Sequence, residues 1–320
     1  MKRELTNFKN VIKLVYTKKT KTFIKFLKGV NLFMQITENN SIFEFSSEET
    51  RRFRGIVLDV LSEACQMPPN EDEYEGIGTL AEKQMHAAIK RFICPDEGCH
   101  EVKIDGSELC IDKSDSDNDK KKKRRFVADI LKGNTIYEIQ TEDFAPLTNK
   151  IKWILENTTY NIVLIHPIAE IKWLNYISAK TGEIEKRQRS PLKGKFTDVA
   201  NDLYFIRDFI GNPRFSLMLL MVEAEQYKKN TVKDARRRPK YRKYELIPVS
   251  LLSAYVFRSV EDYRLFIPSG LPDPFCVKNY SALSGIRGMD AYSIVKTLIH
   301  IGLLEESGNL GRAKAYRVKK

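Results

Sequence analysis

The sequence predicts an α/β protein with a mixed β-sheet core, an extension before this core and a small helical module after it. Two observations carry this prediction. Between residues 76 and 225, segments with helical periodicity alternate with short apolar runs typical of strands. Residues 271–320 instead contain two short helical patterns followed by a strand–turn–strand pattern. We therefore expect four regions: 1–75, 76–225, a basic connector 226–270, and 271–320.

The composition favours a folded protein with a polyanionic partner. The chain has 320 residues, of which 42% are hydrophobic, which is ample for a packed core. Its formal net charge is +12 and its pI is about 9.3. Such a charge favours nucleic acid over a membrane surface as partner. A basic protein without any such partner is the alternative.

The sequence predicts a cytoplasmic protein. No apolar run approaches the ~18 residues that a membrane helix needs, and the N-terminus lacks the pattern of a secretory signal. The five cysteines are few and odd in number, which is typical of a reducing compartment. Cys94, Cys99, His100 and Cys110 lack the compact spacing of zinc sites, so we expect reduced thiols there.

The elements follow from apolar periodicity. A helix over residues 47–64 is expected in the N-terminal region, to which we assign no role. The expected helices of the core are 79–93, 144–156 and 197–209, and its expected strands are 100–104, 125–131, 135–141, 160–168 and 215–222, with a hairpin over 171–184. Residues 112–123 are highly charged and predict a solvated loop.

Two carboxylates are predicted to face each other across a hairpin. Gly133-Asn134 is typical of a two-residue turn, so Lys132 should pair with Thr135. Asp129 then lies opposite Glu138, with Cβ atoms about 5 Å apart. Gln140 should point to the same face, because side chains alternate along a strand.

Facing acids repel each other unless a cation lies between them. Carboxylate, carbonyl and water oxygens are the ligands that Mg²⁺ or Mn²⁺ prefers. Two exposed acids on an edge hairpin are the alternative. Glu82 is a third candidate ligand, although Thr79 and Glu82 also form a capping-box pattern, so Glu82 could simply cap its helix.

These residues resemble the PD-(D/E)XK nuclease superfamily, which has the restriction-endonuclease-like fold, over about residues 77–170. Asp129 matches the motif's aspartate, Glu138-Ile139-Gln140 its (D/E)xK element, and Glu82 the acid of its first helix. The resemblance implies metal-dependent hydrolysis of phosphodiester bonds, with Glu82, Asp129, Glu138 and the Ile139 carbonyl as metal ligands. It also implies that Gln140 orients the attacking water.

The main departure from the family is Gln140, which stands where the motif has lysine. Glutamine can orient a water molecule but cannot supply positive charge. Lys103, Lys132 or Lys150 could supply it from elsewhere, and the sequence does not choose among them.

The wider chain, about residues 76–320, is similar to an uncharacterised bacterial protein family. The similar segments include Gly78-Thr-Leu-Ala-Glu-Lys, Phe126-Val-Ala-Asp-Ile, Tyr137-Glu-Ile-Gln-Thr141, Lys180-Thr-Gly-Glu and Ser190-Pro-Leu-Lys-Gly194. That resemblance supports a shared architecture and implies no activity.

The C-terminal module looks like a winged helix. Residues 277–283 and 289–301 are the expected helices, and residues 303–318 are the expected wing. Such modules place their second helix in the major groove of DNA, although some bind proteins instead. The module's candidate nucleic-acid contacts are Tyr280, Arg287, Lys296, Arg312, Lys314 and Arg317.

Basic tracts outside this module supply further candidates, because phosphate contacts need positive charge. They lie in residues 120–125, 186–195 and 228–243, the third interleaved with tyrosines, and solvated faces without a partner are the alternative. The candidate contacts are Lys193, Arg236, Arg237, Arg238, Lys240 and Arg242.

The sequence thus favours a Mg²⁺- or Mn²⁺-dependent endonuclease acting on DNA. The alternative function is a non-catalytic DNA-binding regulator that retains a degenerate nuclease fold. RNA as the target and a homodimer as the assembly both stay open, and no membrane partner is expected.

Overall fold

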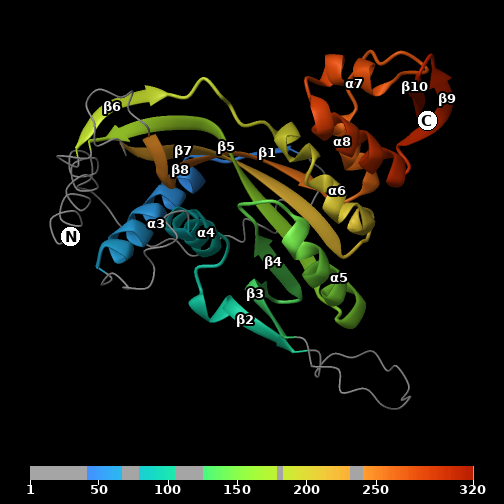
Figure 1. Ribbon diagram of the computed structural model, residues 1–320. Coiled ribbons are helices and arrows are strands. Elements are labelled where there is room, and N and C mark those ends of the chain that lie inside the picture. Colours follow the sequence, from blue (N-terminus) through green and yellow to red (C-terminus); the bar gives the residue numbers. More distant parts are fainter. Residues whose placement is uncertain (1–41, 67–78, 106–124, 179–182, 231–240, 320) are drawn as a thin grey trace, which may run out of the picture.

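The computed structural model describes residues 42–66, 79–105, 125–178, 183–230 and 241–319 (Figure 1). Its centre is an eight-stranded sheet in the order β1-β8-β7-β5-β4-β3-β2, with β6 paired to β5. The β4–β5 and β5–β7 pairs are parallel and the other pairs are antiparallel, so the predicted mixed sheet is confirmed. Its strands are β1 (Ile42–Glu44), β2 (His100–Asp105), β3 (Arg125–Lys132), β4 (Thr135–Ile139), β5 (Asn161–Ile177), β6 (Ile184–Arg189), β7 (Phe215–Asn230) and β8 (Tyr241–Phe257).

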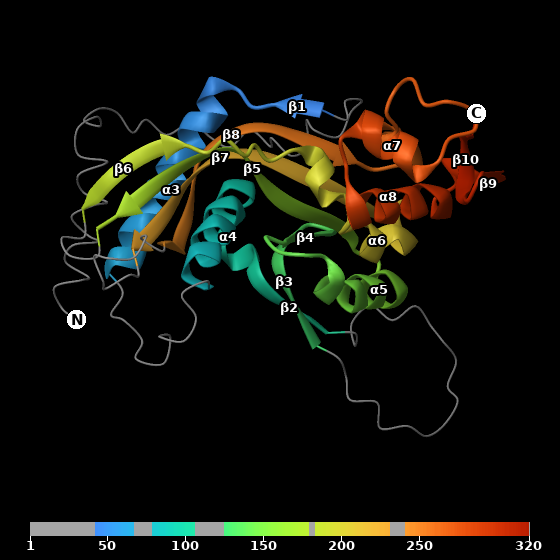
Figure 2. The ribbon, with the colours of Figure 1, turned by 45° about the horizontal axis from the view of Figure 1, so that its top comes forward.

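Both faces of the sheet are covered. Helices α3 (Ser47–Gln66) and α4 (Thr79–Ile93) pack side by side against one face (Figure 2). On β7, Met218, Leu220 and Val222 join their apolar cluster, whereas Leu217 and Leu219 belong to the cluster on the other face. This alternation follows from the two-residue period of a strand, and it explains why β7 reads as a continuous apolar run.

The second face is covered by α5 (Thr148–Asn157) and by short helical turns. The helix expected over residues 197–209 is broken into η4 (Phe196–Ala200), α6 (Leu203–Ile206) and η5 (Arg207–Phe209). Another short turn, η3 (Ala145–Leu147), precedes α5. In the loop between α4 and β2 lies η2 (Glu97–Cys99).

Part of the expected basic connector is sheet. Residues 226–230 lie in β7 and residues 241–257 form β8, while residues 231–240 lie outside the described part of the chain. A register shift between Tyr227 and Lys228 bends this end of the β7–β8 pair. A strand can carry many charged residues where the sheet extends toward solvent. The sequence pattern alone does not distinguish such a strand from a connector.

The N-terminal region is also integrated in part. Strand β1 pairs with β8, and α3 contributes Phe53, Val57 and Leu61 to the core. Residues 42–66 are therefore part of the same layered structure as the sheet. Within the described residues, none of the helices combines the length and apolar character that a membrane crossing demands.

The C-terminal residues form two helices and a two-stranded sheet. After η6 (Val260–Phe266) come α7 (Val277–Ser284), α8 (Gly288–His300), β9 (Leu304–Leu310) and β10 (Ala313–Val318). Gly285 ends α7 with φ of 75°, a left-handed conformation that glycine adopts without strain. Ile294 and Leu298 of α8 belong to the same apolar cluster as Leu217, so these helices share a core with the sheet.

Candidate active site

The β3–β4 hairpin has the predicted register. Ile130 pairs with Tyr137 and Lys132 pairs with Thr135, around a turn in which Gly133 has φ of 58°. The next positions along the two strands are Asp129 and Glu138. There the backbone pairing ends, because the Ile139 amide donates instead to Asp129 Oδ2 at 2.8 Å. The two acids therefore lie side by side at the end of the hairpin.

Glu138 is almost completely buried. Its Oε2 accepts a hydrogen bond from Lys150 Nζ at 2.6 Å, whereas its Oε1 has no partner among the described residues. Burial, opposed by Lys150 and reinforced by the nearby Asp129, raises the pKa of Glu138 to about 7. A buried carboxyl oxygen without a donor is unfavourable, so this arrangement is unlike a packing site.

Asp129 has a different environment. Burial acts to raise the pKa of Asp129, but the His86 ring, whose Nε2 lies 3.0 Å from Oδ2, and the Ile139 amide hold it below the usual value. Both of these contacts are to Oδ2. Adjacent acids with opposite pKa shifts are typical of functional sites.

Two helices bring basic side chains to the acids. Helix α5 supplies Lys150, which also donates to the Val127 carbonyl and so bridges β3 and β4. Helix α4 supplies His86 and, one turn later, the buried Lys90. Lys90 acts electrostatically on Asp129 and forms an ion pair with Glu101.

Glu101 extends the row of acids to a third strand. His100 pairs with Ile130 and Val102 pairs with Ala128, which places Glu101 opposite Asp129. Its φ of 52° is left-handed, which is uncommon for a non-glycine residue and interrupts the regular pairing there. Glu101, Asp129 and Glu138 thus occupy successive strands, with Lys90 paired to Glu101 and Lys150 paired to Glu138.

The side chain of Gln140 points elsewhere. Its Nε2 donates to the Asp143 carbonyl at 2.7 Å, within the loop after β4. The Gln140 amide donates to the Ile165 carbonyl, and its own carbonyl contacts His166 Nδ1 at 2.7 Å. The structure therefore joins Lys150, and not Gln140, to the acid pair, and it selects Lys150 from the three lysines that the sequence left open.

Glu82 lies in α4, one turn before His86, but its side chain is outside the described part of the structure. The predicted convergence of three acids therefore stays a prediction, while the adjacency of Asp129 and Glu138 is confirmed. The contacts of His86, Lys90 and Glu101 at this site were not predicted from the sequence. The four-residue spacing of Glu82, His86 and Lys90 on one helix was the available signal for the two α4 residues.

The donor set fits a small hard cation. In the part of the chain that the structure describes, Glu138 Oε1 has no partner, and Asp129 uses Oδ2 for its contacts with both His86 and Ile139. Carboxylate oxygens and the adjacent Ile139 carbonyl are ligands that Mg²⁺ or Mn²⁺ accepts. Within the described ranges, no three His, Cys, Asp or Glu side chains form a cluster that could hold a metal ion.

The predicted nucleic-acid contacts lie in varied environments. Lys193, Arg287, Lys296 and Arg312 are exposed. Lys314 pairs with Glu306, and Arg317 pairs with Asp273 at 2.8 Å. Arg236, Arg237, Arg238 and Lys240 lie outside the described residues, as does the side chain of Arg242.

Tyr280 does not fit the predicted role. It is fully buried, and its hydroxyl donates to the Phe266 carbonyl at 2.7 Å. A tyrosine in that position stabilises the contact between α7 and η6 and cannot reach nucleic acid from the surface. A tyrosine within a short amphipathic helix has either role, and the sequence alone does not distinguish them.

Comparison with known proteins supplies one match. A family model described as a domain of unknown function, DUF8091, matches residues 108–258. The matched range extends from before β3 to just beyond β8, so it includes Asp129, Glu138 and Lys150. No curated protein and no solved structure matches the chain.

Proposed function

We propose that this protein is a metal-dependent nuclease of the PD-(D/E)XK type that hydrolyses phosphodiester bonds in DNA. The observation that carries the proposal is the acid pair of β3 and β4. Glu138 is buried, and one of its oxygens has no partner among the described residues. It lies beside Asp129, whose pKa is lowered, and it accepts a hydrogen bond from the amine of Lys150.

Electrostatics supports a cation at this pair. Burial and, to a smaller extent, the neighbouring Asp129 carboxylate raise the pKa of Glu138, and a divalent ion would oppose this shift. Asp129, Glu138 and the Ile139 carbonyl would hold Mg²⁺ or Mn²⁺, with Glu82 as a further candidate ligand. The bound ion would activate water and stabilise negative charge on the phosphate.

The protein's own groups would set the geometry of the reaction. His86 and the Ile139 amide fix the orientation of the Asp129 carboxylate. Lys150 takes the place of the lysine that the family has at the position of Gln140, because its amine lies at Glu138. From there, Lys150 would place positive charge beside the reacting phosphate.

The C-terminal helices would act as a winged helix that binds DNA. Met289, Tyr292 and Lys296 form an exposed row on α8, with Arg287 just before it. Residues three and four apart lie on one face of a helix, so this row is suited to enter a groove. Arg312 lies at the turn between β9 and β10, where a wing contacts the backbone.

The test is strand cleavage coupled to metal binding. Purified protein is incubated with supercoiled plasmid, single-stranded DNA or RNA in Mg²⁺ or Mn²⁺, and Mn²⁺ binding is measured by calorimetry. We expect DNA cleavage and Mn²⁺ binding in the wild type, and loss of both in Asp129→Asn and Glu138→Gln. The matched control is Glu156→Gln, an exposed acid on α5 that should behave as the wild type. Cleavage that persists in both acid variants would refute the assignment.

A DNA-binding regulator without catalysis is the second candidate. It is favoured by one observation: Lys150 and His86 already partner the two acids, and Gln140 is turned to Asp143. Tight DNA binding with neither Mn²⁺ binding nor cleavage would establish this candidate in place of the nuclease.

A further inference from the structure

A run of cations without acids follows the edge of the sheet. Residues 186–197, from β6 into η4, contain five cations and no Asp or Glu. These cations are all exposed, and we call them the β6 strip: Lys186, Arg187, Arg189, Lys193 and Lys195. The nearest acids along the chain are Glu183 and Glu185 before it and Asp198 after it.

Few cations of the β6 strip are neutralised by an ion pair within the described structure. Arg187 pairs with Glu225 at 2.9 Å, but the other four cations form no ion pair with a carboxylate within the described structure. By contrast, Lys314 and Arg317 near the C-terminus are paired with Glu306 and Asp273. A cation without an acid partner gains more binding free energy from a phosphate than a cation whose ion pair must first be broken.

The segment after β6 is held flat against the sheet. The Ser190 amide donates to the Lys172 carbonyl at 2.8 Å, and the Gly194 amide donates to the Ala169 carbonyl at 3.1 Å. A Cβ on Gly194 would lie 2.6 Å from that carbonyl oxygen, so only glycine fits there. Lys193 and Lys195 are therefore displayed from a fixed backbone, which reduces the entropy lost on binding.

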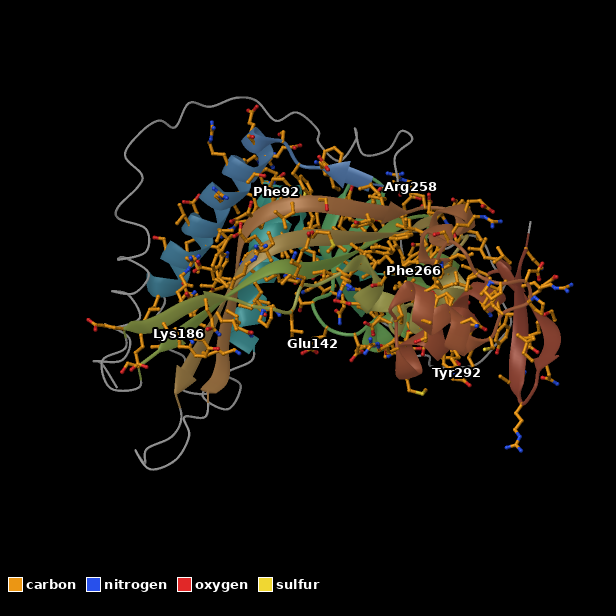
Figure 3. All side chains as sticks on the ribbon, turned by 90° about the horizontal axis from the view of Figure 1, so that it is seen from above. Phe92, Glu142, Lys186, Arg258, Phe266 and Tyr292 are labelled. Atoms are coloured by element: carbon orange, nitrogen blue, oxygen red, sulfur yellow. The ribbon has the colours of Figure 1, made fainter. Side chains whose placement is uncertain are left out.

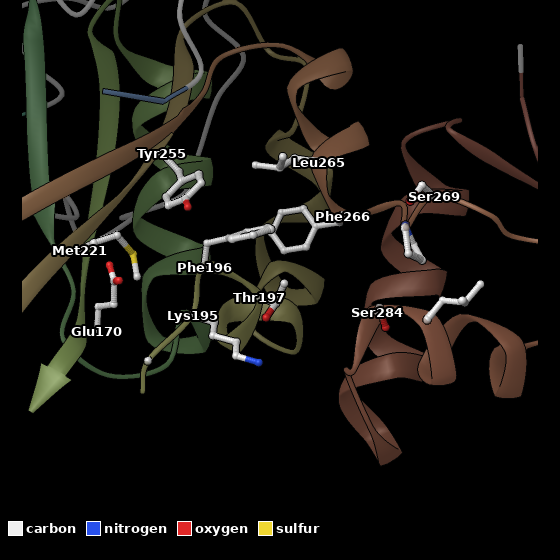
Figure 4. A pocket seen from close by; sticks show the side chains of 13 residues that line it. Glu170, Lys195, Phe196, Thr197, Met221, Tyr255, Leu265, Phe266, Ser269 and Ser284 are labelled. Atoms are coloured by element: carbon white, nitrogen blue, oxygen red, sulfur yellow. The ribbon is translucent and has the colours of Figure 1, made fainter. Parts of the chain in front are cut away.

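The strip continues toward the C-terminal helices. Lys195 lines a cavity of about 450 Å³ together with Ser269 and Ser284, and Ser284 ends α7 (Figure 4). In Figure 3, Lys186 and Tyr292 lie toward opposite ends of the molecule, and Glu142, two residues beyond Gln140, lies between them. The basic surface and α8 thus flank the loop that follows the candidate active site.

We propose that the β6 strip binds the sugar–phosphate backbone of DNA independently of sequence. This inference rests on the proposed function, because it names a second contact surface for the same substrate. The strip holds the backbone by charge, while α8 contacts a neighbouring part of the DNA. Lysines on an edge strand also prevent strand pairing between copies, but Lys193 and Lys195 lie beyond the strand and need another explanation.

The test compares two triple variants of equal charge change in the full chain. The strip variant is Lys186→Gln, Arg189→Gln and Lys193→Gln, all exposed and without acid partners. Arg187 is kept, because its loss would leave the buried Glu225 short of a donor. The control variant is Arg51→Gln, Arg54→Gln and Lys152→Gln, whose side chains are exposed on α3 and α5, away from the residues assigned to DNA contact.

Binding of fluorescent DNA is measured by anisotropy over a range of KCl, with two duplexes of unrelated sequence. The strip variant should bind both duplexes 10- to 100-fold more weakly, with a salt slope smaller by about 2 to 3. The control variant should stay within about threefold of the wild type. Circular dichroism checks that each variant is folded.

The outcomes separate this inference from the proposed nuclease. If the strip variant binds DNA more weakly and the wild type does not cleave DNA, the β6 strip is supported as a DNA-binding surface and the proposed nuclease activity is refuted. If the strip variant binds DNA with wild-type affinity, the β6 strip is refuted as a DNA-binding surface, while the proposed nuclease is unaffected. If that variant also self-associates, its lysines prevent pairing of the edge strand with another copy. Absence of DNA binding in the wild type overturns both. Preferential binding to phosphatidylserine vesicles, lost in the strip variant, would replace DNA by a membrane as partner.

Discussion

Glu138 and Asp129 occupy neighbouring strands, yet their surroundings shift their pKa values in opposite directions. Burial dominates at Glu138, whereas the contacts with His86 and the Ile139 amide dominate at Asp129. Near neutral pH, the pair therefore holds one ionised carboxylate and one carboxyl close to half-protonated. The chemistry of the site is set by individual contacts and not by residue type.

This difference predicts a specific pH dependence of stability. The folded pKa of Glu138, about 7, exceeds its unfolded value of 4.5, so stability is lost as pH rises from 4.5 through 7. The loss is on the order of 3 kcal/mol, at about 1.36 kcal/mol per pKa unit. Urea denaturation of Glu138→Gln should lack this loss, so the stability of the variant relative to the wild type should rise across that range. The same comparison for Glu156→Gln should be flat, and a flat result for Glu138→Gln would mean that the carboxyl ionises normally.

Lys150 and Glu138 should also be coupled in stability. Their side chains are 15% and 4% exposed, and removing one partner of such a pair costs about 3 to 5 kcal/mol. Lys150→Met should therefore lower the free energy of unfolding by about 3 kcal/mol at pH 8. Adding Glu138→Gln should restore most of it, because no buried charge is left behind.

Helix α5 offers a matched control for this cycle. Lys152 is 62% exposed and lies 3.9 Å from Glu156, so Lys152→Met should change stability by less than about 0.5 kcal/mol. Additive effects of Lys150→Met and Glu138→Gln would contradict the ion pair.

Among the elements, the hairpin was the most predictable. Gly133-Asn134 fixes the turn, the turn fixes the register, and the register places Asp129 beside Glu138. Helix α4 was predicted with its observed bounds, because its apolar residues recur with a clear helical period. Local patterns were sufficient in both cases.

Other features depend on contacts distant in sequence. Lys150 reaches Glu138 only because α5 packs over β4, and no spacing rule distinguishes it from Lys103 or Lys132. The full length of the β7–β8 pair was not predicted, because the charged residues at its end were interpreted as a connector. Tyr280 was assigned to the surface because its burial under η6 depends on how the C-terminal helices dock.

Two glycine substitutions should have opposite effects, because Gly194 packs closely against β5 and Gly55 faces open space. Gly194→Ala would force a Cβ to within 2.7 Å of Ile168 Cγ2 and closer still to the Ala169 oxygen, which should cost about 2 kcal/mol. Gly55 is in α3 with no atom within 4 Å of its ideal Cβ, so Gly55→Ala should stabilise by about 0.5 to 1 kcal/mol. Melting temperatures of the two variants test this contrast, and a neutral Gly194→Ala would show that the segment is not held against β5.

For the whole molecule, the shared core is the main consequence of the fold. Ile294 and Leu298 of α8 and Phe275 belong to one apolar cluster with Ile136 and Leu217 of the sheet. Separating the C-terminal helices would expose this surface, so they are not an independent module on a tether. A DNA-binding face on α8 would consequently have a fixed orientation relative to the acid pair.

The pKa of Asp202 depends on how α8 is oriented relative to the β4 loop, so substitutions at Asp202 test this orientation. Burial, together with the charges of Asp143 in the β4 loop and Asp290 of α8, raises the pKa of Asp202 to about 6. The pKa of Asp202 in the folded protein exceeds its unfolded value, so the folded protein loses stability as the pH rises from 3.8 through 6. Asp202 is only half buried, and after allowance for solvent screening Asp202→Asn should stabilise by about 1 kcal/mol at pH 8 and by little at pH 4.

Chemical denaturation at the two pH values measures this effect, with the exposed Glu305→Gln as control. Because Asp143, Asp202 and Asp290 come from the β4 loop, the η4–α6 junction and α8, their repulsion exists only if these elements are docked as described. Asp290→Asn should therefore give part of the same gain at pH 8, and combining it with Asp202→Asn should add less than the sum. Full additivity, or no gain from either substitution, would mean that α8 lies elsewhere and that its exposed row has no fixed relation to the acid pair.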